Sequence, residues 1–216
     1  MKTINKFIAA LLSGYFVFPI NVTAQANKLN QQSKMNMTMQ TDTATFGTGC
    51  FWCTEAIFQS LNGVISATSG YSGGERKNPT YEQVCSGATG HAECINIVYD
   101  PQKISFVELL EAFWKSHDPT TLNRQGNDVG TQYRSVIFYH NSMQQKAAEE
   151  FKQKLNDLKA FDNPVVTEIS PATVFYPAEN YHQEYFKLNG EAPYCKFVIA
   201  PKMEKFKKAF KDKLKK

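Results

Sequence analysis

Residues 43–61, TATFGTGCFWCTEAIFQSL, decide the fold, because a strand pattern gives way to a helix pattern within them. Residues 43–47 alternate between polar and apolar side chains, as a short strand does. Residues 50–61 place apolar side chains at helical spacing, and Gly47 and Gly49 allow a sharp turn between the two elements. The sequence therefore predicts a strand that leads directly into the N-terminus of the first helix of the domain.

Strands and helices alternate along the rest of the chain. A glycine-, proline- and serine-rich stretch, residues 73–90, is typical of a loop. Strands mixed with helices around one modest sheet are typical of a two-layer α/β sandwich. The other predicted elements are strands at residues 64–71, 94–99, 134–140 and 165–170, and helices at residues 106–116, 142–158 and 178–188.

Length and composition limit the class of protein. A chain of 216 residues can bury one good core and is too short for two full-sized domains. Apolar residues make up 42% and charged residues 20%, which excludes a disordered or fibrous chain. The formal net charge of +4 is too small to indicate a nucleic-acid partner, and no pattern indicates oligomerisation, so we expect a monomer.

The first 26 residues have the pattern of a secretory signal peptide. Lys2 and Lys6 precede an apolar run at residues 7–20, and Ala-Gln-Ala at residues 24–26 forms a small-x-small cleavage site. We therefore predict cleavage after residue 26 and export of the mature chain to the periplasm or out of the cell. An uncleaved N-terminal anchor is the alternative, and no other membrane association is expected.

A polar stretch rich in Asn and Gln follows, at residues 27–42, and is typical of a flexible linker. Met35, Met37 and Met39 alternate within it, and a soft copper site is an alternative to plain linker methionines. The sequence thus predicts a single folded domain at residues 43–216.

The last predicted helix, residues 202–216, is basic and amphipathic. It carries eight lysines, and one face presents Met203, Phe206, Phe210 and Leu214. We expect this apolar face to pack on the domain itself, and contact with an anionic membrane is the alternative.

Cys50 and Cys53 stand one helical turn apart at the start of the first predicted helix. A thiol there meets the positive end of the helix dipole, so we expect a lowered pKa of Cys50 and a nucleophilic thiolate. The Cys-x-x-Cys spacing is shared by redox pairs, metal sites and structural disulfides. A zinc site needs two further ligands, for which His91 and Cys94 are the candidates.

Several motifs occur in a fixed order along residues 43–208. They are TGCFWCTE (48–55), SGYSGG (69–74), NPTYEQVCSG (78–87), TGHAE (89–93), QGNDVGTQYRS (125–135) and YHQ (181–183). Together they resemble the A-type peptide methionine sulfoxide reductases, and the resemblance covers essentially the whole predicted domain.

The resemblance implies both a fold and a reaction. The implied fold is α+β, a two-layer α/β sandwich with a ferredoxin-like core and the catalytic cysteine at the N-terminus of the first helix. The implied reaction is the thiol-dependent reduction of methionine S-sulfoxide, free or in peptides and proteins, through a cysteine sulfenic acid and then a disulfide. A thioredoxin-like partner would reduce that disulfide, with no cofactor and no metal, and the role would be repair of oxidised exported proteins.

The resemblance also assigns the nucleophile and the substrate pocket. Cys50 matches the family nucleophile, which agrees with its position at a helix N-terminus. Phe51 and Trp52 would form the walls of the pocket that holds the S-methyl group, and an indole suits a half-buried, half-wet site. Packing of both rings in the core is the simpler alternative.

Four further residues match the family's polar groups. Glu93 would donate a proton to the sulfoxide oxygen, and a carboxyl beside aromatic rings should have a raised pKa. Tyr81 and Tyr133 would hold that oxygen through their hydroxyls. Asp128 would support the same pocket by hydrogen bonding, whereas His91 and His182 are expected to have structural roles or to support the residues that touch the substrate.

The thiol that resolves the sulfenic acid is left open by the sequence. Cys195 lies where family members commonly carry a recycling cysteine, and Cys53 is the nearest partner in the chain. A relay through both is a third possibility, and Cys85 and Cys94 are expected to be bystanders.

Two other classes of function remain as alternatives. A periplasmic thiol–disulfide oxidoreductase would use Cys50 and Cys53, would exchange disulfides with proteins and would not depend on Glu93. A non-enzymatic protein would use the cysteines as structural disulfides and the linker methionines as a metal-binding arm, and would lose its fold on reduction. Neither alternative explains the GHAE, GND and NPTY motifs.

Overall fold

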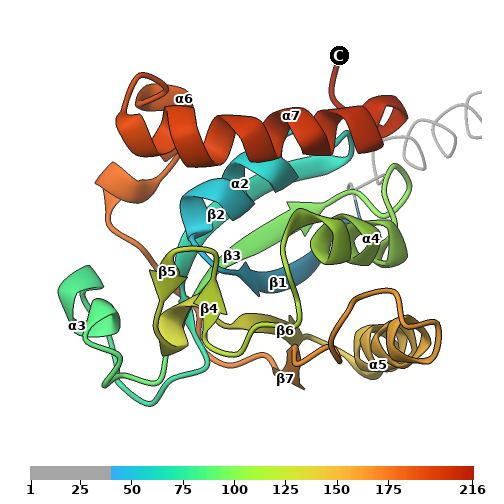
Figure 1. Ribbon diagram of the computed structural model, residues 1–216, viewed down its shortest axis with the longest axis horizontal. Coiled ribbons are helices and arrows are strands. Elements are labelled where there is room, and N and C mark those ends of the chain that lie inside the picture. Colours follow the sequence, from blue (N-terminus) through green and yellow to red (C-terminus); the bar gives the residue numbers. More distant parts are fainter. Residues whose placement is uncertain (1–39) are drawn as a thin grey trace, which may run out of the picture. The chain divides into compact units, whose positions relative to one another are not determined.

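A computed structural model describes residues 40–216 of the chain, in which a β-α-β-β-α-β unit carries the first sheet strands (Figure 1). The predicted strand that leads into a helix is present, and so are the four elements that follow it. The six elements of the unit are β1 (Asp42–Thr48), α2 (Phe51–Gln59), β2 (Val64–Ser72), β3 (Ala92–Tyr99), α4 (Phe106–Ser116) and β6 (Ser135–Tyr139).

The sheet has six strands in the order β7-β6-β1-β3-β2-β8. Its four middle strands, β6-β1-β3-β2, are antiparallel throughout, which is the strand order of a ferredoxin-like core. The implied fold is therefore confirmed. Strand β7 (Glu168–Pro171) extends one edge in parallel with β6, and β8 (Tyr176–Pro177) extends the other edge antiparallel to β2.

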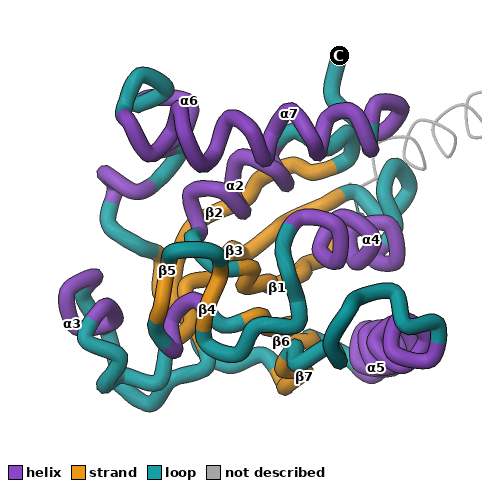
Figure 2. Tube along the Cα trace, in the orientation of Figure 1, coloured by secondary structure: helices purple, strands orange, loops and turns teal. Residues whose placement is uncertain are grey.

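The main core lies between the sheet and helices α2 and α4, which pack on the same face (Figure 2). Phe46 of β1 illustrates the packing, because its ring centroid lies 5.5 Å from that of Phe58 on α2 and 5.2 Å from that of Phe113 on α4. Helix α5 (Ser142–Asp157) packs beside them against β6 and β7. Burial of these rings fixes the start of α2 against the end of β1.

The basic C-terminal segment packs on the domain, as the sequence analysis expects. Helix α7 (Ala200–Ala209) contacts α2 and α4, and Met203, Phe206 and Phe210 of its apolar stripe are buried. The helix is shorter than predicted, because a 3-10 turn, Lys211–Lys213, follows it. None of the helices between residues 40 and 216 combines the length and the apolar character that crossing a membrane requires.

Two predicted segments differ in the structure. The predicted loop at residues 73–90 contains a short helix, α3 (Tyr81–Cys85), which begins with a capping box between Thr80 and Gln83. The predicted helix at residues 178–188 is instead a 3-10 turn, Asn180–His182, followed by the short helix α6 (Tyr185–Leu188). The capping box accounts for the helix within the predicted loop, whereas at residues 178–188 side chains bind other elements and those contacts override local helical preference.

Smaller differences occur at element ends. Asp42, placed in the linker by the sequence, is the first residue of β1, and the strand predicted from residue 165 begins at Glu168. A hairpin that the sequence analysis did not predict, β4 (Arg124–Gln125) with β5 (Asp128–Val129), follows α4. The predicted signal peptide and the methionine-bearing stretch lie outside the described residues.

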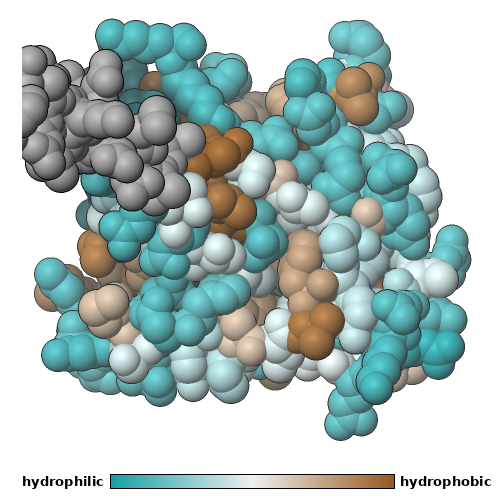
Figure 3. All heavy atoms as spheres, turned by 180° about the vertical axis from the view of Figure 1, so that it is seen from behind, coloured by the Kyte–Doolittle hydropathy of each residue, from teal (hydrophilic) through white to brown (hydrophobic). Residues whose placement is uncertain are grey.

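Figure 3 shows the rear face, where hydrophilic residues predominate and apolar residues form small separate spots.

Candidate active site

Cys50 lies at the N-cap of α2, where β1 ends. Gly49 has a φ of +94°, and a Cβ atom added to it would lie 2.6 Å from Cβ of Gln125, so the turn into the helix requires glycine. The turn leaves Cys50 only 8% exposed. The structure therefore places the predicted nucleophile at a helix N-terminus and almost completely out of solvent.

Glu93 of β3 lies against the same helix end. Its side chain is buried, and its Oε2 accepts the backbone N–H of Phe51 at 3.0 Å. Burial, and next the nearby charge of Cys50, raise the pKa of Glu93 well above its ordinary value. The direction of this pKa shift agrees with the expectation from the sequence, so the carboxyl keeps its proton to a higher pH than an exposed glutamate does.

The thiols of Cys50 and Cys53 interact, because each shifts the pKa of the other. The interaction with Cys53, and next burial, raise the pKa of Cys50 well above its ordinary value, whereas the interaction with Cys50 lowers the pKa of Cys53. The expected lowering at Cys50 was wrong for the free site, because the neighbouring thiol and burial outweigh the helix dipole. These shifts favour the negative charge on Cys53 over Cys50.

Tyr81 and Tyr133 lie at the same end of the sheet as Glu93. Both side chains are half-buried, and burial is the main reason that the pKa of each phenol lies above its ordinary value. The charge of Glu93 contributes to both shifts, which places the two phenols around that carboxyl. The structure therefore brings together the four predicted groups Cys50, Glu93, Tyr81 and Tyr133.

Asp128 is linked to the sulfurs through a residue that the sequence analysis missed. Tyr194 donates its hydroxyl to Oδ2 of Asp128 at 2.8 Å and lies within hydrogen-bonding reach of Cys50 and Cys53. Its only sequence signal was its position directly before Cys195. The hairpin β4–β5 that carries Asp128 was also not predicted, so the contact could not be anticipated from spacing.

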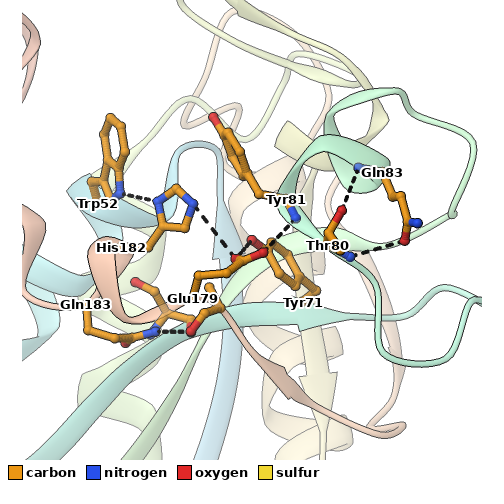
Figure 4. Close-up of polar contacts among 10 residues, drawn as sticks. Trp52, Tyr71, Thr80, Tyr81, Gln83, Glu179, His182 and Gln183 are labelled. Atoms are coloured by element: carbon orange, nitrogen blue, oxygen red, sulfur yellow. Dashed lines mark hydrogen bonds and ion pairs between the residues drawn. The ribbon is translucent and has the colours of Figure 1, made fainter.

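Trp52 is held by aromatic neighbours from the C-terminal part of the chain. Its indole stacks on Tyr185 with ring centroids 3.6 Å apart, and Tyr194 contacts it edge-on at 5.8 Å. The indole N–H donates to Nδ1 of His182 at 3.1 Å (Figure 4). Phe51 is buried beside it, so Trp52 is the half-exposed member of the pair.

The two histidines have the structural positions that the sequence analysis expects. His182 lies under Trp52, whereas His91 accepts the N–H of Gly74 at 3.0 Å and pins the loop that precedes α3. Within residues 40–216, neither imidazole ring hydrogen-bonds the sulfur of Cys50.

The remaining cysteines differ in their distance from the site. Cys195 begins a short π-helical stretch before α7 and is fully buried, and Cys50 is near enough to contribute to its raised pKa after burial. Cys85 and Tyr81 each affect the pKa of the other, so Cys85 lies closer to the site than a bystander would. Cys94 is buried on the other face of the sheet, in a small cluster with Val136.

The sequence profile described as peptide methionine sulfoxide reductase matches residues 42–214, which include every site residue above. The chain belongs to this family. As a member of the peptide methionine sulfoxide reductase family, it is an oxidoreductase that acts on methionine sulfoxide. The cysteine pair beside a buried carboxyl with a raised pKa is consistent with thiol-dependent chemistry in this reductase.

Individual relatives of this reductase are similar over most of its length. The peptide methionine sulfoxide reductase MsrA of Saccharolobus solfataricus is 55% identical over 174 residues, 81% of this chain and 97% of the relative. That of Polynucleobacter asymbioticus is 56% identical over 169 residues, 78% of this chain and 89% of the relative.

Solved structures show the same fold. The reduced form of Mxr1 from Saccharomyces cerevisiae superposes with a TM-score of 0.68 and 36% identity, covering 73% of this chain and 91% of that chain. Methionine sulfoxide reductase A of Corynebacterium diphtheriae superposes with a TM-score of 0.64 and 36% identity, covering 73% and 78% of the two chains.

Proposed function

We propose that this reductase acts on the S epimer of methionine sulfoxide, free or in peptides and proteins, with Cys50 as the nucleophile. One observation carries the proposal: the buried carboxyl of Glu93, whose pKa is raised, accepts the N–H of Phe51 in the first turn of α2, the residue that follows Cys50. A soft nucleophile and a proton donor are the two groups that sulfoxide reduction needs, and both lie at one helix end.

The reaction transfers one oxygen atom and two electrons. Cys53 accepts the proton of Cys50, the resulting Cys50 thiolate attacks the sulfoxide sulfur, and Glu93 gives its proton to the oxygen. The hydroxyl then passes to the Cys50 sulfur as the substrate's sulfur–oxygen bond and the transient bond between the two sulfurs break, so methionine leaves and Cys50 becomes a sulfenic acid. The phenols of Tyr81 and Tyr133 donate hydrogen bonds to the oxygen as it gains charge. Phe51 and Trp52 contact the methyl group.

Cys53 then resolves the sulfenic acid. Cys53 lies one helical turn after Cys50 and the two thiols interact, so a disulfide can form between them with loss of water. Cys195 is the second thiol of a relay, because it is buried near Cys50 on a different element. A thioredoxin-like dithiol returns the enzyme to its reduced state by thiol–disulfide exchange.

The test is turnover of separated sulfoxide epimers. Purified, reduced protein is incubated with the S or R epimer of a methionine sulfoxide peptide and dithiothreitol, and methionine is followed by mass. We expect turnover of the S epimer alone and its abolition in Cys50→Ser. A folded wild-type protein that reduces neither epimer would reject the proposal, and disulfide exchange through Cys50 and Cys53 would become the function to test.

We also propose that the enzyme is exported and repairs oxidised proteins outside the cytoplasm as a monomer. The support is the signal-peptide pattern of residues 1–26. In a bacterial host, the intact mass of the protein from the periplasmic fraction should begin at Asn27. A full-length chain confined to the cytoplasm would contradict export, and a full-length chain in the membrane fraction would indicate the uncleaved anchor.

A further inference from the structure

Glu179 is a carboxylate that no step of the proposed reaction uses, yet it binds two elements of the site. It stands at the start of the 3-10 turn Asn180–His182, between β8 and α6. Its Oε1 accepts the backbone N–H of Tyr81 at 2.9 Å, and its Oε2 accepts the hydroxyl of Tyr71 at 2.9 Å (Figure 4). Glu179 therefore ties the C-terminal turn to the first residue of α3 and to β2.

The same carboxylate faces the ring that supports Trp52. Because the indole of Trp52 donates to Nδ1 of His182, the hydrogen of the neutral imidazole lies on Nε2. Nε2 is 3.9 Å from Oε2 of Glu179 and has no hydrogen-bond partner among the described residues. A negative charge beside Nε2 favours the tautomer with the hydrogen there, and this tautomer leaves Nδ1 free to accept the indole N–H.

Packing keeps the ring of His182 in place. Its side chain is 2% exposed, and its ring centroid lies 5.0 Å from that of Phe51 and 4.5 Å from that of Tyr81. The turn itself is anchored, because the side chain of Gln183 donates to the carbonyl of Ser69 at 2.9 Å and accepts its N–H at 3.0 Å. The imidazole cannot turn over without disturbing these contacts, so its tautomer decides whether Trp52 has an acceptor.

We propose that Glu179 is a positioning residue that orients Trp52 through the tautomer of His182 and Tyr81 through the start of α3. The inference rests on the proposed function, in which Trp52 contacts the methyl group and Tyr81 binds the oxygen of the sulfoxide. One carboxylate thus sets the distance between the apolar side and the oxygen-binding side of the substrate site.

The decisive variant is Glu179→Gln. Its amide keeps one oxygen for the N–H of Tyr81 but presents an NH₂ group to His182, which favours the tautomer with the hydrogen on Nδ1. The matched control is Glu82→Gln, which makes the same change at an exposed carboxyl on α3. The charge of Glu82, like that of Glu179, acts to raise the pKa of His182. Glu179→Asp keeps the charge and should recover part of the loss.

The first readout is independent of activity. The chain has two tryptophans, so the indole N–H resonances of Trp52 and Trp114 are resolved by NMR and assigned with Trp114→Phe. In E179Q we expect the Trp52 resonance to move while that of Trp114 stays, and in E82Q we expect neither to move. A Trp52 resonance that stays at its wild-type position in folded E179Q would overturn the proposal, whatever the activity of the variant.

The second readout is kinetic. In E179Q we expect kcat/KM for the S-sulfoxide peptide to fall about tenfold, the effect of one lost hydrogen bond, with most of the change in KM. In a Trp52→Phe background the same substitution should cost clearly less, because its partner is already gone. An undiminished tenfold loss there would overturn the route through His182. Wild-type protein without turnover would reject the proposed function, while the NMR comparison would still decide the position of Trp52.

Discussion

The carboxyl of Glu93 is buried against the first turn of α2, where it accepts a hydrogen bond from the N–H of Phe51. Burial and the neighbouring Cys50 make ionisation costly, so the group holds its proton at a pH where an exposed glutamate has lost it. The sequence predicted this property from the motif. The reason, a carboxyl enclosed between β3 and a helix N-terminus, required the structure.

The pH dependence of turnover should follow from this shift. Glu93 must be protonated to donate, so kcat/KM should stay high through neutrality and fall as pH rises through the raised pKa of Glu93. Glu93→Gln should lower single-turnover kcat/KM by roughly 10²–10⁴-fold and remove the alkaline fall. Iodoacetamide labelling of Cys50 across the same pH range reports the thiol separately. An alkaline fall that persists in E93Q would assign that limb to another group.

Glu55 is a second buried carboxyl, on α2, and it should affect stability. Burial is the main cause that raises its pKa to about 7. Because the folded state binds the proton more tightly than the unfolded chain, this residue destabilises the fold as pH rises from about 4.5 towards 8. Glu55→Gln should therefore raise the free energy of unfolding by about 1–2 kcal/mol at pH 8. The gain, measured by urea unfolding, should disappear near pH 4; an equal gain at both pH values would contradict the assignment.

At the scale of elements, both cysteines of the pair lie in the first turn of helix α2. Cys50 is the N-cap and Cys53 lies one turn later, so oxidation can join them within the helix. Cys195, by contrast, is buried at the start of a separate element, outside α2. This difference predicts the order of disulfide formation.

After one equivalent of sulfoxide and no reductant, peptide mapping should find the Cys50–Cys53 disulfide first. Cys53→Ser should still release methionine in a single turnover, but more slowly because no thiolate takes the proton of Cys50, and it should lose at least about tenfold in steady-state turnover with a thioredoxin-type reductant. Cys94→Ala, a buried thiol on the other face of the sheet, is the control and should keep both rates. A first disulfide between Cys50 and Cys195 in wild type would contradict the order.

Some helices could be predicted from the local sequence and others could not. Helix α4 has its predicted bounds, because Ser105 and Glu108 form a capping box and its apolar side chains face the core at helical spacing. The segment at residues 178–188 was wrongly predicted as one helix. There Glu179 and Gln183 bind distant strands and α3, and Glu184 adopts a φ of +50°, so tertiary contacts decide the backbone.

At the scale of the whole molecule, the site joins segments that are far apart in the chain. Asp128 and Tyr194 are 66 residues apart and share a hydrogen bond of 2.8 Å, and Trp52 and His182 are 130 residues apart and share one of 3.1 Å. The ordered motifs identified the groups that carry the chemistry. They could not identify Tyr194, Tyr185 or Glu179, because no local pattern records which distant side chains meet.

The described part of the chain contains every residue of the candidate site, from Cys50 to Cys195. A chain that starts at Gln40 should therefore keep kcat/KM for the S-sulfoxide peptide within about twofold of the full-length protein. The comparison needs matched thermal unfolding curves as a control. A truncated chain that folds but loses most of its activity would show that the first 39 residues contribute to the reaction.

The contact between Glu93 and the N–H of Phe51 has a consequence for the spent enzyme. Once the carboxyl has given up its proton, it is an anion at the positive end of α2, and the same N–H then donates a stronger, charge-assisted bond. The helix dipole thus stabilises the enzyme in the state that has already reacted. To return to its starting state, the enzyme must therefore regain a proton on Glu93 as well as two electrons at its disulfide. These are two separate steps at the end of each catalytic cycle.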